Sequence, residues 1–371
     1  MSRPDKPFKI YSEGIEHMAL NQFFDALSQP FAIRGALMAD AHCGYSLPIG
    51  GVVATDGVVV PAWIGFDIGC GVCAMRTRYT RDQIVYDSVS SIYAGVRERI
   101  PMGFNHHKHP VSWRTPPMSK RGERIFYEKG GLRQLGTLGG GNHFIEVGYD
   151  EDGYVWVVVH SGSRGVGHGI ATQYMKIASG TNKAKEGHYG FELNTPDGID
   201  YIIDMEMCLE FALFNRYQII DEVLRTMSKV LGGDSGSQSF INRNHNHAEI
   251  IDGNVVIHRK GATHAGAGMM GVIPGNMKDG SFIVEGLGNP DSLNSSSHGA
   301  GRVMGRREAK QQLDVKLFTE MMSDARVYCD ANEHNIDESP LAYKDIFKVM
   351  GEQNGLVKVL HHIKPIMNWK G

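Results

Sequence analysis

Histidine-containing strings occur at four points of the chain, and three of them contain glycine. They are Gly139-Gly-Gly-Asn-His143-Phe-Ile-Glu146, His160-Ser-Gly-Ser-Arg164-Gly, Asn244-His245-Asn-His247 and Ser297-His298-Gly-Ala-Gly-Arg302. A fifth string, Gly65-Phe-Asp-Ile-Gly-Cys-Gly-Val72, holds Asp67 and Cys70 three residues apart on a glycine-rich turn, so both can reach one ion. A single histidine is more often a hydrogen-bonded structural residue, and a lone cysteine is usually a small buried hydrophobe. Five such strings together favour a metal site.

The residue types limit the choice of metal. One thiolate, one carboxylate and several imidazoles are too soft a set for Mg²⁺ and too rich in nitrogen for Ca²⁺, which leaves Mn²⁺, Zn²⁺, Fe²⁺ or Co²⁺. Five donors also allow two ions bridged by Cys70. Arg164 and Arg302 lie in two of the strings, and arginine offers paired donors to phosphate oxygens, while glycine exposes backbone N–H groups. The strings predict metal-assisted phosphate chemistry, with a metallohydrolase acting on a neutral substrate as the alternative.

Six motifs, in this order along the chain, resemble those of the RtcB family of RNA-splicing ligases. They are Asp40-Ala-His-Cys-Gly-Tyr-Ser-Leu-Pro-Ile-Gly-Gly51, Gly65-Phe-Asp-Ile-Gly-Cys-Gly71, Gly141-Asn-His-Phe-Ile-Glu146, His160-Ser-Gly-Ser-Arg-Gly165, His258-Arg-Lys-Gly-Ala262 and Ser297-His-Gly-Ala-Gly-Arg302. The similarity extends from about residue 10 to Gly371. It implies an RtcB-like fold and an enzyme that joins an RNA 3′-phosphate or 2′,3′-cyclic phosphate to a 5′-hydroxyl, using GTP and Mn²⁺, through a guanylylated histidine.

The resemblance also implies a role for each string. His298 matches the family's nucleophile. The residues that match the two Mn²⁺ sites are Asp67, Cys70 and His143 for one ion and Cys70, His160 and His245 for the other. Contacts to guanosine or its phosphates are implied for Asn142, Glu146, Asn276, Ser281, Gly299, Ala300, Gly301, Tyr343 and Lys370. Arg164 and Arg302 are expected to contact phosphate or RNA. Glu146 can accept hydrogen bonds from guanine N1–H and N2–H and would therefore select GTP over ATP.

The sequence departs from the family pattern in two ways. Asn276 stands where the family usually has serine, so an amide replaces a small phosphate-binding hydroxyl. The chain is also short for the family, chiefly between residues 100 and 135 and between 180 and 240. Some shorter relatives are associated with a release-factor-like protein, which implies repair of damaged RNA rather than tRNA splicing. The sequence leaves both substrates open, as it does the need for such an activating partner.

Two other functions are compatible with the same residues. A 2′,3′-cyclic phosphate hydrolase would open RNA ends without sealing them, and it differs from a ligase in consuming no 5′-hydroxyl partner. A GTP- or RNA-binding module without sealing activity would be expected to have lost His298 or Cys70. Both residues are present, which favours the enzyme.

The strings fall at the ends of predicted strands. Apolar runs between glycine turns predict strands within residues 31–78, and Tyr154-Val-Trp-Val-Val-Val-His160 predicts another that ends on its histidine. Further strands are expected at 254–258 and 281–285. Apolar periodicity predicts helices at 81–100, 168–179, 200–230, 306–323 and 343–351. Without an internal repeat or a Pro/Gly/Ser-rich linker, residues 1–371 are expected to form a single compact α+β domain of mixed β-sheets with flanking helices.

Composition is that of an ordinary globular protein. With 38 Lys+Arg against 41 Asp+Glu the net charge is −3, so an RNA partner has to be held by a local patch. Five cysteines in 371 residues argue against a secreted disulfide framework, and no leader or membrane-length apolar run is present, so we expect a cytoplasmic protein outside the membrane. The one cationic run, within a loop predicted for residues 104–124, is either a solvated surface or an RNA-contacting flap.

Overall fold

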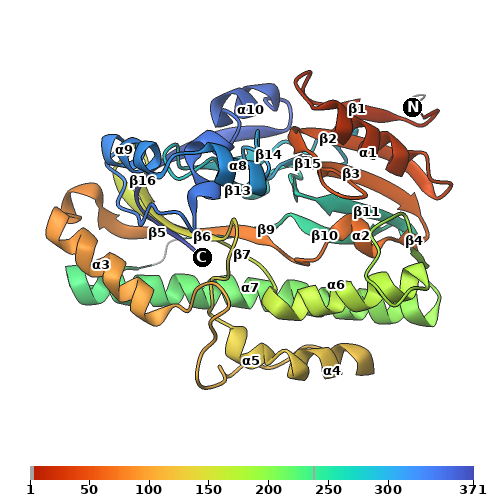
Figure 1. Ribbon diagram of the computed structural model, residues 1–371, viewed down its shortest axis with the longest axis horizontal. Helices are drawn as coiled ribbons and strands as arrows, with labels where there is room; N and C mark the ends of the chain where they lie inside the picture. Colours follow the sequence, from red (N-terminus) through yellow and green to blue (C-terminus); the bar gives the residue numbers. More distant parts are fainter. Residues whose placement is uncertain (1–3, 237–238) are drawn as a thin grey trace.

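Two large β-sheets organise the computed structural model, which describes residues 4–236 and 239–371 (Figure 1). The larger sheet is antiparallel and has the strand order β13 (Met270–Pro274), β14 (Ser281–Gly286), β16 (Val357–Lys370), β6 (Phe144–Tyr149), β7 (Tyr154–Ser161), β5 (Gly71–Thr80), β9 (Phe240–Asn244). The second sheet has the order β1 (Phe8–Ile10), β2 (Ala32–His42), β3 (Ile49–Asp56), β11 (Val255–Lys260), β10 (Asn246–Ile251). The α+β class expected from the sequence is confirmed.

Shorter ladders and helices surround the two sheets. The ladders are β4 (Val58–Val59) with β8 (Phe191–Glu192) and β12 (Ala262–His264) with β15 (Ser295–Ser297). The helices are α1 (His17–Leu27), α2 (Pro61–Ile64), α3 (Tyr86–Arg99), α4 (Lys120–Glu128), α5 (Gly131–Gln134), α6 (Arg164–Ser179), α7 (Pro196–Leu231), α8 (Arg306–Gln312), α9 (Val315–Asp324) and α10 (Ile346–Glu352). None of these helices combines the length and apolar character needed to cross a bilayer.

Helix α7 is the long helix that runs along the seven-stranded sheet (Figure 1). Its start is set by Thr195, whose hydroxyl accepts a hydrogen bond from the Gly198 N–H at 3.2 Å, with Pro196 in the first turn. Gly232, at φ 77°, ends it. Its apolar face shares one buried cluster with residues of β5, β6, β7 and β16, so these strands lie against a rigid support.

Two expectations about individual elements were wrong in part. Residues 120–124, expected in a loop, begin helix α4, because the Ser119 hydroxyl caps it by accepting from the Gly122 N–H at 2.9 Å and itself donates to Asp204 of α7 at 2.7 Å. The single helix expected at 306–323 divides into α8 and α9, because the Asp314 side chain caps a new helix, accepting from the Leu317 N–H at 3.3 Å.

Strand β16 has no counterpart among the predicted strands, although it occupies the middle of the seven-stranded sheet. It pairs with β14 on one side and with β6 on the other, and in this second register Asn368 lies opposite Glu146 and Lys370 opposite Phe144. The end of the chain is thereby placed beside the string that contains His143.

Candidate active site

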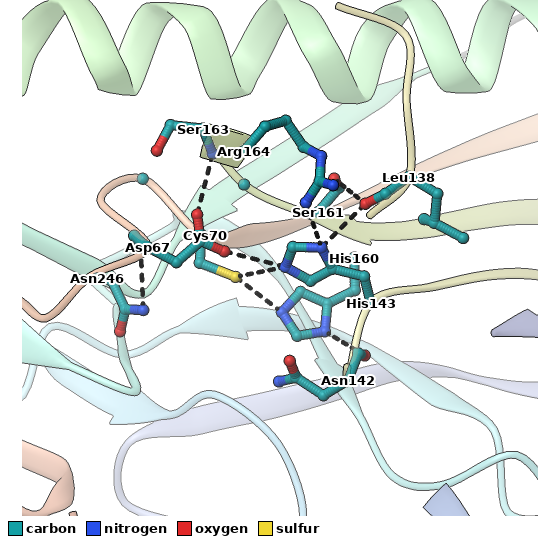
Figure 2. Close-up of polar contacts among 12 residues, drawn as sticks. Asp67, Cys70, Leu138, Asn142, His143, His160, Ser161, Ser163, Arg164 and Asn246 are labelled. Carbon is teal, nitrogen blue, oxygen red and sulfur yellow. Dashed lines mark hydrogen bonds and ion pairs between the residues drawn. The ribbon is translucent and has the colours of Figure 1, made fainter. Parts of the chain in front are cut away.

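Four side chains, those of Asp67, His143, His160 and His245, surround the thiol of Cys70, and Figure 2 shows three of them, Asp67, His143 and His160. Its Sγ lies 3.4 Å from His143 Nε2 and 3.2 Å from His160 Nε2. His143 Nε2 is 3.0 Å from Asp67 Oδ2, and His160 Nε2 is 3.3 Å from His245 Nε2. The residues form two triads that share Cys70, Asp67–Cys70–His143 and Cys70–His160–His245, and the ligand atoms of each triad lie within 4.8 Å of one another. All are buried apart from Asp67, whose side chain is 32% exposed.

The sheet order explains the convergence. Strands β6, β7, β5 and β9 are neighbours in the seven-stranded sheet, and their ends meet at one edge. His143 directly precedes β6, His160 is the second-last residue of β7, Cys70 directly precedes β5 and His245 directly follows β9. The antiparallel ladder therefore brings together four segments that are far apart in the sequence.

Hydrogen bonds behind the imidazoles direct their free nitrogens into the centre. His143 Nδ1 lies 2.9 Å from the Leu138 carbonyl oxygen, and His160 Nδ1 lies 3.2 Å from the carbonyl oxygen of Asn142. Because a carbonyl only accepts, each Nδ1 carries the proton and each Nε2 presents a lone pair toward Cys70.

The protonation of the centre also suits a metal. Burial lowers the pKa of His160 and of His245 well below 6.5, so both imidazoles are neutral ligands. Burial, assisted by the charge of Asp67, raises the pKa of the Cys70 thiol well above 9, so a bound cation would displace its proton. A sulfur, a carboxylate and three imidazoles fit two divalent transition-metal ions, each with positions left for a substrate oxygen.

Arg216 of α7 holds the backbone around the metal triads. Its side chain is fully buried, and Nη1 donates to the carbonyl oxygens of Gly69 and Ser161, each at 2.8 Å. Nε donates to Asn242 Oδ1 at 2.7 Å and Nη2 to Asn244 Oδ1 at 2.6 Å. These partners are sequence neighbours of three metal-facing residues. Arg216 was not among the predicted site residues, because the sequence indicated only a helix at 200–230. The available signal was an arginine at a position that the apolar face requires to be buried.

His298 lies beside the metal triads, with its ring centroid 4.8 Å from that of His245. Its Nδ1 is 2.6 Å from Oδ2 of Asp40, a fully buried carboxyl that also accepts from the backbone N–H of His298 at 3.1 Å and of Gly299 at 3.3 Å. Burial raises the pKa of Asp40, but the His298 imidazole outweighs it and the pKa is lowered, so Asp40 is ionised. His298 Nδ1–H therefore donates, which leaves Nε2 as the free nucleophilic nitrogen. Asp40 is the first residue of the first of the six motifs, but the motif alone indicated no role for it.

A cavity of about 270 Å³ adjoins His298. Its wall contains eight of the nine residues for which nucleotide contacts are implied: Asn142, Glu146, Asn276, Gly299, Ala300, Gly301, Tyr343 and Lys370. The ninth, Ser281, is fully buried and lies outside the lining.

Three buried oxygen atoms in this region have no hydrogen-bond partner within the protein. They are Glu146 Oε1, Asn368 Oδ1 and Ser281 Oγ. An unpaired buried acceptor costs about 1–3 kcal/mol of folding free energy, and a ligand that donates an N–H to it would remove that cost. Burial raises the pKa of Glu146 to about 8, and Lys370 only partly opposes this.

Glu338 contacts four of the residues that line the cavity. Its carboxylate lies 3.2 Å from Arg302 Nη1 and 2.7 Å from both Arg306 Nη1 and Lys370 Nζ, and it accepts from the Tyr343 hydroxyl at 2.6 Å. Burial raises the pKa of Glu338, but Lys370 and Arg306 outweigh it and lower the pKa to about 2. No motif string contains Glu338, so its role is visible only in three dimensions.

The two arginines predicted to contact phosphate have different surroundings. Arg302 lines the cavity, but Nη1 faces Glu338, Nη2 donates to the Asp337 carbonyl oxygen at 2.5 Å and Nε to that of Met304 at 3.0 Å. Arg164 begins α6 at φ 58° and donates to the Gly103 carbonyl oxygen at 3.1 Å. It lines neither the nucleotide-sized cavity nor the larger one described below.

Asn276, the departure from the family pattern, closes the turn between β13 and β14. Its Oδ1 accepts from the backbone N–H of Lys278 at 2.9 Å and of Asp279 at 3.0 Å, and its Nδ2 donates to the Asp279 carboxylate at 2.7 Å. The amide is thus engaged in holding the loop that forms one side of the cavity.

A second, larger cavity of about 680 Å³ opens on the other side of His298. It reaches Asp67, Cys70 and His245 of the metal triads. His298, Asn142 and His42 line both cavities, so the metal centre and His298 stand between them.

The fold and the paired metal triads define a candidate metalloenzyme of the α+β class with two cavities that both reach His298. The sequence profile of the family described as "tRNA-splicing ligase RtcB" matches residues 22–130 and 112–371. The chain belongs to this family.

Individual relatives match over nearly their whole length. "RNA-splicing ligase RtcB" of Escherichia coli (strain K12) is 33% identical over 407 residues, covering 100% of this chain and 99% of the relative. "tRNA-splicing ligase RtcB" of Aeropyrum pernix is 30% identical, covering 90% and 87%. "RNA-splicing ligase RtcB" of Mycobacterium tuberculosis is 28% identical, covering 94% and 100%.

Removal of the shared ligand should have a larger effect than removal of an outer one. Cys70→Ala is expected to lose both metal ions, because both triads contain Cys70. His245→Ala should lower the metal affinity of one site only, by at least about 10- to 100-fold, since loss of a residue that merely supports a ligand can already have that effect. Metal content after dialysis measures both. Cys73→Ala, which removes a buried thiol outside the triads, is the matched control. Full occupancy in the Cys70 variant would show that Cys70 is only a buried hydrophobe.

Replacing Asp40 by asparagine should disable His298 while keeping its shape. An amide that donates to Nδ1 would move the ring proton to Nε2, and loss of the analogous carboxylate from a Ser-His-Asp triad lowers the rate by about 10⁴-fold. We expect a loss of this order in any covalent chemistry at His298, with unchanged metal content. Single-turnover kinetics measure the rate, and a variant that reacts at the parental rate would contradict the assignment.

Proposed function

We propose that the protein is a GTP-dependent RNA ligase that joins an RNA 3′-phosphate or 2′,3′-cyclic phosphate to a 5′-hydroxyl through GMP carried on His298. The observation that carries the proposal is the position of His298. Its Nε2 is free, its Nδ1 is held by a buried carboxylate, and it lines a purine-sized cavity, a larger cavity and the metal centre at once. The ligase names of the relatives support the same reaction class.

GTP is proposed to occupy the smaller cavity. Guanine carries N1–H and N2–H donors on one edge, and Glu146 Oε1 is a buried acceptor without a partner in the cavity wall. Adenine has no donor at N1. Gly299, Ala300 and Gly301, which follow His298 directly, would then lie against the phosphates, as expected for a nucleotide whose α-phosphorus has to reach His298.

The two triads are proposed to hold Mn²⁺, which when bound would neutralise charge on the phosphate oxygens. His298 Nε2 attacks the α-phosphorus of GTP, a nitrogen–phosphorus bond forms and pyrophosphate leaves, while the Nδ1 proton stays on the hydrogen bond to Asp40. Any cyclic phosphate is hydrolysed to a 3′-phosphate first. An oxygen of that 3′-phosphate then takes GMP from His298, and the 5′-hydroxyl oxygen displaces GMP to give the phosphodiester.

The larger cavity is proposed to receive the RNA ends. Lys260, from the His258-Arg-Lys-Gly-Ala motif, lines it and donates a hydrogen bond to the Ala62 carbonyl oxygen at 3.1 Å. Burial lowers the pKa of Lys260 to about 8, with Glu186 opposing the shift. Lys260 lines the same cavity as Asp67, Cys70 and His245, and a cation at this position supports binding of an RNA phosphate there.

Labelled GTP separates the proposal from its alternatives. Incubation with α-labelled GTP and Mn²⁺, followed by denaturing electrophoresis, should show a covalent adduct that His298→Ala abolishes with metal content retained. His247→Ala, which changes a histidine that belongs to neither triad, should keep the adduct. An adduct that maps to another histidine would contradict the nucleophile. With RNA added, a 3′-phosphate end and a 5′-hydroxyl end should both be consumed. Opening of the cyclic phosphate without loss of the 5′-hydroxyl would identify a hydrolase.

Affinity for GTP should depend on pH through Glu146. Its pKa of about 8 in the free protein means that ionised Glu146, the form that accepts both guanine donors, becomes more abundant as pH rises toward 8. GTP binding should therefore strengthen by up to about 10-fold per pH unit between pH 6 and 7.5 and level off above 8.

Glu146→Gln should remove this pH dependence and reduce the preference for GTP over ATP by about 10- to 100-fold, because a charged hydrogen bond contributes about 1.5–3 kcal/mol. Calorimetric titration at several pH values measures both quantities. Glu151→Gln, a substitution outside the cavity lining, is the control. Unchanged base preference in the Glu146 variant would place base recognition elsewhere.

A further inference from the structure

A tight turn between α3 and α4 exposes a single aromatic side chain. In residues 102–105 the Asn105 N–H donates to the Met102 carbonyl oxygen at 3.2 Å, and the Asn105 side-chain amide donates to the same oxygen at 3.0 Å. Gly103 takes φ 63°, a conformation that favours glycine. Phe104 follows it and is 101% exposed, so its ring contacts no other part of the described structure. A phenylalanine in water on an ordered turn has no role in the core.

The turn is fixed to the active site. The Gly103 N–H donates to the Gly139 carbonyl oxygen at 2.9 Å, and Arg164 Nη2 donates to the Gly103 carbonyl oxygen at 3.1 Å. Gly139 opens the string that leads to His143, and Arg164 follows the β7 end that contains His160. The turn that carries Phe104 is therefore hydrogen-bonded to the segments that lead to His143 and away from His160.

Two exposed cations accompany Phe104. No Asp or Glu occurs between Arg99 and Gly122, and Lys108 is exposed, as are the histidines His106 and His109. The backbone N–H of His107 donates to the Arg133 carbonyl oxygen at 2.9 Å, which brings the exposed Arg133 alongside this segment.

We propose that Phe104 is a stacking platform for an unpaired nucleobase of the RNA strand whose end enters the metal centre. An exposed aromatic face with exposed cations nearby is a combination with which proteins hold single-stranded nucleic acid, because every base has a face to stack and every nucleotide a phosphate to pair. The inference rests on the proposed function, in which an RNA strand is the substrate. It adds a contact to that strand that is independent of base identity.

A tryptophan placed at this position reports stacking directly. Phe104→Trp, titrated with an RNA oligonucleotide carrying a 3′-phosphate, should show quenching of the added fluorescence relative to the parental protein. Tyr86→Trp, at another exposed position (79% exposed) at the start of α3, should not respond. Polyphosphate, which has charge but no bases, should leave the emission of Trp at position 104 unchanged. RNA that binds in a filter assay without quenching this emission would overturn the proposal.

Joining kinetics provide a second readout. Phe104→Ala should raise the KM for RNA by about 5- to 100-fold, the range that one base–aromatic stack supplies, and Phe104→Leu should resemble it, whereas Phe104→Tyr should restore the parental KM. An RNA with a single abasic residue at the stacked position should bind the parental protein and the alanine variant equally. Full rescue by leucine would mean a general apolar contact and overturn stacking.

The two hypotheses fail in different ways. If no GMP adduct forms on His298 in the parental protein, the proposed function fails. If the adduct forms and RNA is joined, but the Phe104 variants bind and join RNA like the parent, only the stacking platform fails.

Discussion

The structure depends on burying a guanidinium in the middle of α7. Arg216 is surrounded by protein, and its donors are satisfied by two carbonyl oxygens and two side-chain amides that belong to β5, β7, β9 or the turns beside them. A buried charge is expensive unless its donors are all paired, so these segments have to adopt one relative position for the helix to pack. The positions of Cys70, His160 and His245 follow from that requirement, since each is the sequence neighbour of one of these partners.

Buried carboxylates position side chains around the smaller cavity. Asp40 is ionised and sets the tautomer of His298, while Glu338 is ionised and gathers Arg302, Arg306 and Lys370 into one wall. Glu146 differs, because burial raises its pKa to about 8 and leaves an acceptor without a partner. Within the described structure, Glu338 is engaged by three cations and a hydroxyl, and Asp40 is engaged through one oxygen, Oδ2. Asp40 Oδ1 and Glu146 Oε1 are left without a protein partner.

The sequence predicted the α+β class and the strings at strand ends that supply the triads, because these strings are local patterns, whereas the division of the five residues into two triads came only from the resemblance to the family. It did not predict Arg216 or Glu338, whose partners lie far away along the chain and leave no periodic signal. Strand β16 was missed as well, since its pairing with β6 is a tertiary fact. The phosphate role predicted for Arg302 stays a prediction, because its three nitrogens all have partners within the protein.

The central position of β16 affects the order in which the two halves of the site can be assembled. All members of the metal triads lie between residues 67 and 245, and the strands that carry them pair among themselves. The nucleotide cavity instead needs Asn368 beside Glu146, a contact between residues 222 positions apart. Contacts of such long range form late in folding, because the intervening residues must first be closed into a loop at a cost in chain entropy. During synthesis, a nascent chain could therefore gather its metal ligands well before it could hold a nucleotide, so metal loading and nucleotide binding would be separated in time.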